Sequence, residues 1–457
     1  MTFNETIVAP ATAASVSALA IIRVSGKEAL KITSSVFKGK NLEEAVSHTV
    51  HYGFIVNKTT HETIDEVMIS VFKAPKSFTT EDTAEISCHG SPFIVNKIIE
   101  ALIVAGARLA KPGEFSLRAF MNGRINLAQA EAVADVIASE NEMQHKVAIQ
   151  QMRGGYATEL QQLRQELIDY LALIELELDF GEEDVEFAKR EQLISFLVKL
   201  AKHIAYLTDS FKVGNVIKQG IPVAIIGKPN AGKSTLLNVL LNEERAIVSD
   251  IAGTTRDTIE DVMHYKGFSF RFIDTAGIRH TDDSIESIGV EKALQKARNA
   301  SLVIYLFDIG SSQAQNILDE IKALQIAEAI VVPVANKIDK VNWKVTAPFS
   351  QIPNVQFISA TTKFNVERLK EFLYQLATQN TQAVTANSIV TNIRHYEALQ
   401  KTSEYLTRAK LGLENKLSGE LVASDLRETL NYLGDITGQV DNEEVLASIF
   451  SRFCIGK

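Results

Sequence analysis

The amino-acid sequence predicts an α+β domain at the N-terminus, an α/β domain in the middle of the chain, and an all-α domain that the middle domain interrupts. A length of 457 residues allows about three domains. The 9 prolines are absent from residues 113–221 and 354–457, which are rich in Ala, Gln, Glu and Leu. Between these two stretches, short apolar segments alternate with helical ones, as in a parallel, doubly wound sheet. We therefore expect a compact α/β domain inserted into a helical one.

Residues 1–120 form the predicted N-terminal α+β domain. Runs of β-branched and apolar residues favour strands, and alternation of polar with apolar residues indicates a half-buried strand. Glycine and proline separate the segments. The predicted strands are Ser17–Val24, Glu66–Phe72 and Thr83–Cys88, and the predicted helices are 27–37 and 93–105.

Residues 121–215 and 381–457 form the two predicted parts of the helical domain. Apolar residues within 157–180 recur every three or four positions, which places them on one helical face and predicts a bundle core. These residues are Leu160, Leu163, Leu167, Leu171, Ile174 and Leu178. The acidic stretch Asp179–Glu186 fits either a metal site or a solvated helix end, and a solvated helix end is the commoner case.

Residues 216–380 form the predicted inserted domain, with strands at IPVAIIG, FSFRFID, SLVIYLF, AIVVPVA and VQFIS. The first strand leads into GKPNAGKS at 227–234, which matches the P-loop motif G-x-x-x-x-G-K-[ST] and is followed by an apolar helix. Backbone N–H groups of such a loop surround phosphates, and the helix N-terminus adds a favourable dipole. We expect Lys233 to reach the β- and γ-phosphates and the Ser234 hydroxyl to bind Mg²⁺.

Four further motifs follow in the order of a Ras-like P-loop GTPase domain. The first switch loop places Thr255 to bind Mg²⁺, and DTAG at 274–277 ends a strand, where its Asp can hold Mg²⁺ through water. In NKID at 336–339, the Asp339 carboxylate can accept the N1–H and the exocyclic amine of guanine, a donor pair that adenine lacks. Ser359-Ala360 offers a backbone N–H to guanine O6.

The predicted GTP-binding residues belong to these five motifs. They are Asn230, Ala231, Gly232, Lys233, Ser234, Thr235, Ser249, Asp250, Ile251, Ala252, Gly253, Thr254, Thr255, Asp274, Thr275, Ala276, Gly277, Asn336, Lys337, Asp339, Ser359 and Ala360.

The predicted hydrolytic machinery differs from that of Ras-like GTPases. Those enzymes orient the attacking water with a Gln directly after the D-x-x-G motif, where this chain has Ile278. Arg256 or Arg279 could supply positive charge, although each is more simply a surface or structural arginine. Alternatively, the side-chain carbonyl of Asn230 and backbone carbonyls of 249–255 could hold a monovalent cation in place of an arginine finger.

Several segments together resemble the MnmE (TrmE) family of tRNA uridine-modification GTPases over essentially the whole chain. In the inserted domain they are GKPNAGKS, IVSDIAGTTRD and DTAGIR, which alone would also fit ribosome-assembly GTPases. More specific are TIVAPAT, IIRVSG, PGEFSLRAF and NLAQAEAVADVI near the N-terminus, and the terminal FCIGK.

The resemblance implies an enzyme that hydrolyses GTP, an acid anhydride, and acts in a heterotetramer with the flavoprotein MnmG. Together they form the 5-aminomethyl or 5-carboxymethylaminomethyl group on the wobble uridine of tRNA. A tetrahydrofolate derivative, 5-formyl- or 5,10-methylene-tetrahydrofolate, donates the one-carbon unit. The resemblance also implies a homodimer in the cytoplasm, whose G domains approach each other when GTP and K⁺ are bound.

The resemblance also assigns roles to single residues. Asn230, Ser249, Ile251 and Thr254 match the K⁺-ligand positions, and Ser234 and Thr255 match the Mg²⁺ ligands. Glu286 matches the glutamate that orients water. The predicted catalytic residues are therefore Glu286, Lys233 and Asn230.

The N-terminal domain resembles folate-binding domains of the glycine-cleavage type and is the expected dimerisation domain. Arg23, Glu85, Arg124 and Lys457 match folate-contact positions, although the family often has Lys at the position of Arg124. From residue types alone, Arg23 could hold the ligand's carboxylates and Glu85 could accept hydrogen bonds from a pterin-like ring. Cys454 is either a chemical group or part of a structural tail folded against the folate site.

Composition argues against several other classes of protein. The formal net charge of −9 argues against coating nucleic acid through a basic surface, and 2 cysteines argue against a disulfide framework. Apolar runs of about seven residues are far short of the roughly 20 that span a bilayer, and the N-terminus lacks the basic start of a signal peptide. The expectation is a soluble, cytoplasmic enzyme. The alternative is a GTP-dependent regulatory switch acting on ribosome or RNA assembly.

Overall fold

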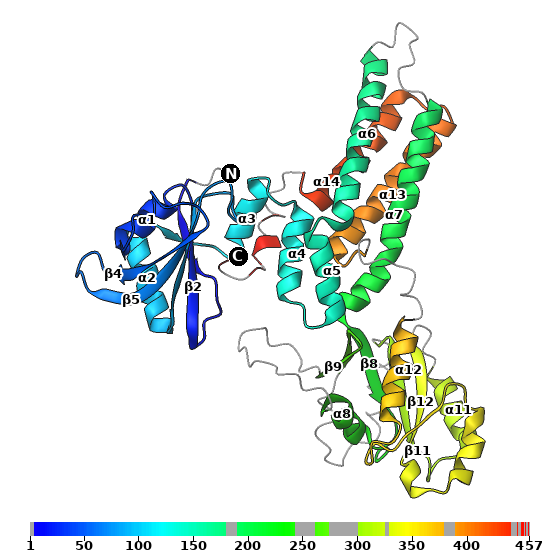
Figure 1. The fold of residues 1–457 in the computed structure, drawn as a ribbon. Helices are drawn as coiled ribbons and strands as arrows, with labels where there is room; N and C mark the ends of the chain where they lie inside the picture. The colour runs from blue at the N-terminus through cyan, green and yellow to red at the C-terminus, as the bar shows by residue number, and fades with distance from the viewer. Residues whose placement is uncertain are drawn as a thin grey trace. The chain divides into compact units, whose positions relative to one another are not determined.

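The computed structural model divides into two compact units, which Figure 1 draws as a ribbon. Unit 1 comprises Met1–Ile137, Gln151–Leu176 and Leu426–Lys457, and unit 2 comprises Ala138–Gln150 and Glu177–Asp425. The structure describes residues 4–179, 190–242, 261–273, 300–324, 329–378 and 389–439, and residues 446, 449–451, 453 and 456.

Unit 1 contains a seven-stranded sheet with the strand order β3-β4-β5-β6-β2-β1-β7. Neighbouring strands are antiparallel except for the parallel pair β1 and β7. One face is apolar and packs against helices α1 (Ala29–Val36) and α2 (Pro92–Val104), with a buried core that includes Ile22, Ile69 and Ile86. The strands are β1 (Ile7–Pro10), β2 (Ser17–Ser25), β3 (Phe37–Lys38), β4 (Thr49–Val56), β5 (Thr63–Phe72), β6 (Thr83–Gly90) and β7 (Arg108–Leu109).

The three strands and two helices predicted in this region are present, and β4 is an additional long strand that the pattern did not indicate. Gly53 interrupts its apolar run. The structure shows why a glycine stands there, because a Cβ at this position would lie 2.5 Å from the ring of Phe37. A close tertiary contact thus accounts for the residue that weakened the strand signal.

The helical elements belong partly to unit 1 and partly to unit 2. Five of the six predicted core residues of α6 are buried, whereas Leu178, near its end, is 38% exposed. In unit 2, α7 packs against α13, with the rings of Phe211 and Tyr396 stacked 4.3 Å apart. The helices are α3 (Glu114–Met121), α4 (Leu127–Ile137), α5 (Glu142–Met152), α6 (Gly155–Asp179), α7 (Arg190–Gln219), α13 (Ile393–Glu414) and α14 (Gly419–Thr437).

Unit 2 also contains the inserted α/β domain, a six-stranded sheet with the order β13-β12-β11-β8-β10-β9. Five strands are parallel, as predicted, but the edge strand β9 pairs antiparallel with β10. Helices α8 (Lys233–Asn242), α11 (Ala314–Ala323) and α12 (Val366–Thr378) accompany the sheet. The strands are β8 (Ile221–Ile226), β9 (Asp261–Tyr265), β10 (Phe268–Phe272), β11 (Leu302–Asp308), β12 (Ile330–Asn336) and β13 (Gln356–Phe357). The predicted fold class is therefore correct.

Among the helices that the structure describes, none is long and apolar enough to cross a membrane.

Candidate nucleotide site and ligand pocket

The P-loop lies at the carboxyl end of the central strand β8. Strands β10 and β11 flank β8 on opposite sides, so the chain connections diverge here. In open α/β sheets, ligands bind at such a switch point, beyond the carboxyl ends of the strands. The buried strand β8 leads into the loop at Gly227, and α8 begins at Lys233, which aims the first-turn N–H groups of the helix at the loop.

Two glycines of the loop are required by close approaches of other groups. A Cβ at Gly227 would lie 2.0 Å from the backbone oxygen of Leu306, and a Cβ at Gly232 would lie 2.4 Å from Asn336 Nδ2. Their φ angles, +152° and +99°, also lie in the region that side chains disfavour. The motif glycines therefore allow the loop to lie directly against β11 and β12.

Lys233 curls back over the loop that precedes it. Its Nζ donates to the backbone oxygens of Gly227 at 2.8 Å and of Lys228 at 2.9 Å. Ser234 is half-buried in the first turn of α8, and Thr235 is exposed. The ammonium therefore lies at the mouth of the loop, where a phosphate oxygen could replace a carbonyl as its acceptor.

The NKID segment, at the end of β12 and separated from β8 by β11, holds the P-loop. Asn336, only 2% exposed, donates from Nδ2 to the backbone oxygen of Ala231 at 2.8 Å. Lys337 donates from Nζ to the backbone oxygen of Asn230 at 2.6 Å. Asp339 is exposed in the short 3₁₀ helix Ile338–Lys340.

The Ser359-Ala360 segment joins the same site. Both residues are buried, and the Ala360 N–H donates to Asn336 Oδ1 at 3.0 Å. The structure thus brings three sequence motifs into one hydrogen-bonded cluster. It also gives the Ala360 N–H a protein acceptor, so guanine O6 would have to share this donor.

Many predicted residues lie outside the described part of the chain. These are Ser249, Asp250, Ile251, Ala252, Gly253, Thr254, Thr255, Asp274, Thr275, Ala276, Gly277, Glu286, Lys457, and also Arg256, Arg279 and Cys454.

Asp308 belongs to this site but was not predicted from the sequence. It ends β11, opposite Asn336 in the register, and its Oδ2 lies 2.8 Å from Lys337 Nζ. Burial alone would raise the pKa of Asp308, but the hydrogen bonds from Lys337 and the Gly310 N–H outweigh it and lower the pKa below the ordinary value. The sequence feature that could have indicated Asp308 as a site residue is its place as an acidic residue at the end of an otherwise apolar strand.

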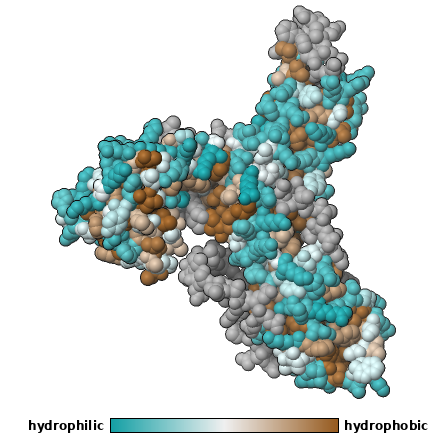
Figure 2. All heavy atoms as spheres, in the orientation of Figure 1, coloured by the Kyte–Doolittle hydropathy of each residue, from teal (hydrophilic) through white to brown (hydrophobic). Residues whose placement is uncertain are grey.

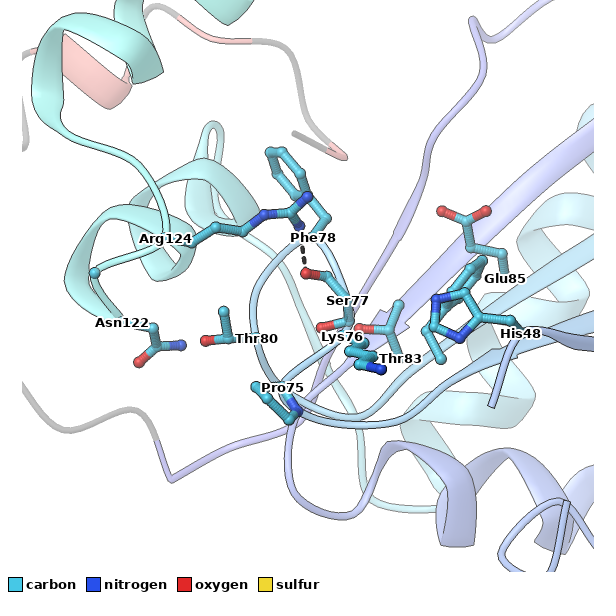
Figure 3. A pocket seen from close by; sticks show the side chains of 12 residues that line it. His48, Pro75, Lys76, Ser77, Phe78, Thr80, Thr83, Glu85, Asn122 and Arg124 are labelled. Carbon is cyan, nitrogen blue, oxygen red and sulfur yellow. Dashed lines mark hydrogen bonds between the residues drawn. The ribbon is translucent and has the colours of Figure 1, made fainter. Parts of the chain in front are cut away.

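A second candidate site is a pocket of about 660 Å³ in unit 1, beside the segment that joins β5 to β6 (Figure 3). Predicted residues Glu85 and Arg124 line it, and Arg124 donates to the backbone oxygen of Ser77. The guanidinium of Arg124 also lies 5.3 Å from the ring centre of Phe78. His48, Lys76 and Asn122 also line the pocket and were not predicted. Their sequence positions are far apart, and no motif contains them.

Arg23 acts on this pocket through Glu85. Its Nε and Nη2 lie 2.9 Å and 2.8 Å from Glu85 Oε1, and its Nη1 donates to the backbone oxygen of Gly456 at 3.2 Å. The guanidinium is thus engaged by a carboxylate and by the C-terminal tail. Arg23 therefore fixes the position of Glu85, and its contact with ligand carboxylates stays a prediction.

The sequence matches models of two protein domains and many full-length proteins. The model for the GTP-binding protein TrmE N-terminus covers residues 6–124, and that for the MnmE helical domain covers residues 127–454. A protein of Cytophaga hutchinsonii described as tRNA modification GTPase MnmE is 49% identical over 99% of this chain and 98% of its own length. Proteins of Flavobacterium johnsoniae and Bacteroides fragilis with the same description are 51% and 47% identical, over 99% of this chain and 99% and 100% of their own lengths. The chain therefore belongs to the MnmE family of tRNA modification GTPases.

Proposed function

We propose that this chain is a K⁺-activated GTPase that, with the flavoprotein MnmG, modifies wobble uridine in tRNA. The product is the 5-aminomethyl or 5-carboxymethylaminomethyl group, and a tetrahydrofolate derivative supplies the one-carbon unit. One observation carries the proposal: the P-loop, NKID and Ser359-Ala360 form a single hydrogen-bonded site in a chain that matches the family along its whole length.

The P-loop would bind the triphosphate through its backbone N–H groups and Lys233. Oxygen donors suit Mg²⁺, and the hydroxyls of Ser234 and Thr255 would hold it so that it neutralises phosphate charge. The exposed carboxylate of Asp339 would accept the two guanine donors. Glu286 would orient the attacking water.

Asn230 is the described residue assigned to the K⁺ site. Its φ of +59° is left-handed, a conformation that Asn tolerates better than most residues, and its side-chain carbonyl is a suitable ligand for a hard cation. Ser249, Ile251 and Thr254 would complete the site, and K⁺ would supply positive charge beside the phosphates.

We expect GTP hydrolysis to be faster in K⁺ than in Na⁺, and the Asn230→Gly variant to lose this acceleration. Glycine adopts the left-handed φ without strain, so the change removes the carbonyl ligand and keeps the backbone. Phosphate release in the two salts at several protein concentrations measures the effect. Asn230→Asp, which retains an oxygen, is the matched control and should remain K⁺-dependent. Equal wild-type rates in both salts would contradict K⁺ activation.

The unit 1 pocket has the size and chemistry for a reduced folate. Its volume of about 660 Å³ lies within the usual range of small-molecule sites, roughly 300–1,000 Å³. Glu85 offers a carboxylate that Arg23 orients toward donors of a pterin-like ring, and Arg124 and Lys457 would provide cations for the ligand's carboxylates. When bound, the folate would supply the one-carbon unit.

The Glu85→Gln variant should bind 5-formyl-tetrahydrofolate at least about 10-fold more weakly, because a charge-assisted acceptor is lost. Calorimetry on the full chain measures the affinity. Glu100→Gln, at an exposed ion pair with Lys97, is a control that should bind as wild type does. An unchanged affinity in Glu85→Gln would remove this residue from the site.

Exposed apolar residues on the unit 1 sheet, away from α1 and α2, support a homodimer through the N-terminal domain. Tyr52 of β4 lies opposite Met68 of β5, and these residues are 61% and 50% exposed. Val50 and Leu19 are exposed to a similar extent. Figure 2 shows hydrophobic residues, in brown, among the hydrophilic ones on the surface of unit 1. Apolar surface of this kind is typical of protein–protein interfaces.

Nucleoside analysis of tRNA tests the overall function. Cells that lack the gene should lose the modified wobble uridine, and the wild-type gene should restore it. An unchanged nucleoside profile would refute the role in modification. If GTP hydrolysis were intact in that case, the result would favour the regulatory-switch alternative.

A further inference from the structure

We infer that Asp308 is a positioning residue for the cation response of the P-loop, because it fixes Lys337, which in turn holds the backbone of Asn230. This inference rests on the K⁺ activation proposed above. It assigns a role to a residue that lies in none of the GTPase motifs.

The carboxylate of Asp308 is oriented from both sides. Its Oδ1 accepts from the Gly310 N–H at 2.9 Å, and its Oδ2 accepts from Lys337 Nζ at 2.8 Å. The side chains of Lys337 and Asp308 are 24% and 28% exposed. Because the backbone of β11 and the following turn fix one oxygen, the other oxygen gives the flexible lysine a defined partner.

Lys337 links the carboxylate of Asp308 to the P-loop. Its ammonium donates both to Asp308 and to the backbone oxygen of Asn230, 2.6 Å away. The neighbouring Asn336 holds the next loop carbonyl, that of Ala231. Asn336 is buried, so packing helps to keep it in place, whereas Lys337 is a long, part-exposed side chain whose direction depends on the carboxylate.

The held peptide has a conformation that costs free energy. Asn230 is left-handed, with φ at +59°, and such residues need surrounding contacts to keep them there. This backbone conformation fixes the direction in which the Asn230 side chain leaves the loop. In Asp308→Asn a single amide oxygen cannot serve both the Gly310 N–H and Lys337 as the two carboxylate oxygens do. Lys337 would then hold the Asn230 peptide less firmly, and the carbonyl proposed to bind K⁺ would be less well placed.

The test is GTP hydrolysis by full-length Asp308→Asn as a function of K⁺ concentration at constant ionic strength. We expect the half-activating K⁺ concentration to rise at least about 5-fold, with a smaller change in the rate at saturating K⁺. Asp308→Glu keeps the charge and should restore much of the response. Asp319→Asn, on the exposed face of α11 with a single bond from Gln315, is the matched control and should behave as wild type.

The outcomes separate this inference from the proposed function. If the wild type does not respond to K⁺, both fail. If the wild type responds and Asp308→Asn has the same half-activating concentration, only the role of Asp308 is overturned. If Asp308→Asn does not fold, Lys337→Met in the same titration decides: a similar shift supports the inference, and an unshifted midpoint overturns it.

Discussion

Replacing Arg118 by leucine is expected to lower the free energy of unfolding by about 3–5 kcal/mol, the usual cost of removing one partner from a buried ion pair. Arg118 in α3 is fully buried. Its guanidinium lies 3.0 Å from Glu81 and 3.0 Å from Glu114, which are only 12% and 4% exposed. Leucine would leave these two carboxylates with less compensation in a poorly solvated site.

Urea denaturation of the full-length protein measures the effect. Lys97→Leu is a useful comparison because Lys97 also pairs with a glutamate, but both side chains are exposed, at 45% and 63%. Such surface pairs contribute about 0–1 kcal/mol. If the two variants lost the same stability, the buried network would not have the importance that its geometry indicates.

The decrease in the free energy of unfolding caused by Arg118→Leu should depend on pH. Burial tends to raise the pKa of Glu114, but the hydrogen bonds from Arg108, the Lys111 N–H and Arg118 lower it below the ordinary 4.5. A carboxyl with a lowered pKa contributes stability above about pH 4.5, and this contribution disappears as the pH falls through the folded value. The difference in the free energy of unfolding between wild type and Arg118→Leu should therefore become smaller as the pH falls below about 4.5.

This network also shapes the ligand pocket. Glu81 accepts from Ser25 as well as from Arg118, and Asn122, just after α3, donates to the backbone oxygen of Thr79. Arg124 holds the carbonyl of Ser77. The segment between β5 and β6 is thus tied to α3 and to the residues just after it at three points. We expect weaker folate binding in Arg118→Leu even under conditions where the variant is folded.

Sequence motifs predicted the parts of the nucleotide site whose residues are consecutive in the chain. GKPNAGKS specifies a loop directly after a strand and the start of a helix, and the structure shows this order. The pairing of Asp308 with Lys337 could not be predicted in this way, because it depends on the register between β11 and β12. The pocket is a similar case, since His48, Lys76 and Asn122 meet only after the sheet and α3 have formed.

Arg23 shows a different limit of sequence-based reasoning. Its charge and its place on an apolar strand suggested a receptor for ligand carboxylates. The register places it directly opposite Glu85, with which it forms an ion pair. A charge pattern along one strand does not reveal the partner on the next strand, so the ion pair between Arg23 and Glu85 could not be predicted from the sequence.

Replacing Asn336 by alanine is expected to weaken GTP and GDP binding at least about 30-fold. The change removes the donor to the Ala231 carbonyl and the acceptor of the Ala360 N–H, and Asn336 itself is buried. A buried polar group without a partner costs roughly 1–3 kcal/mol, and both groups belong to segments of the proposed nucleotide site. Titration of the full chain with a fluorescent guanine nucleotide measures the loss.

Two further substitutions show which bond matters. Asn342→Ala removes only the cap of a 3₁₀ helix, at Lys344 N, and should leave nucleotide affinity within about twofold of wild type. Asn336→Asp can still accept from the Ala360 N–H but cannot donate to the Ala231 carbonyl. If the Asn336→Asp variant binds nucleotide as poorly as Asn336→Ala does, the lost hydrogen bond to the P-loop accounts for the loss of affinity. If Asn336→Asp binds nucleotide nearly as well as the wild type does, the P-loop keeps its shape without this hydrogen bond. The role of Asn336 is then to place the Ser359-Ala360 segment.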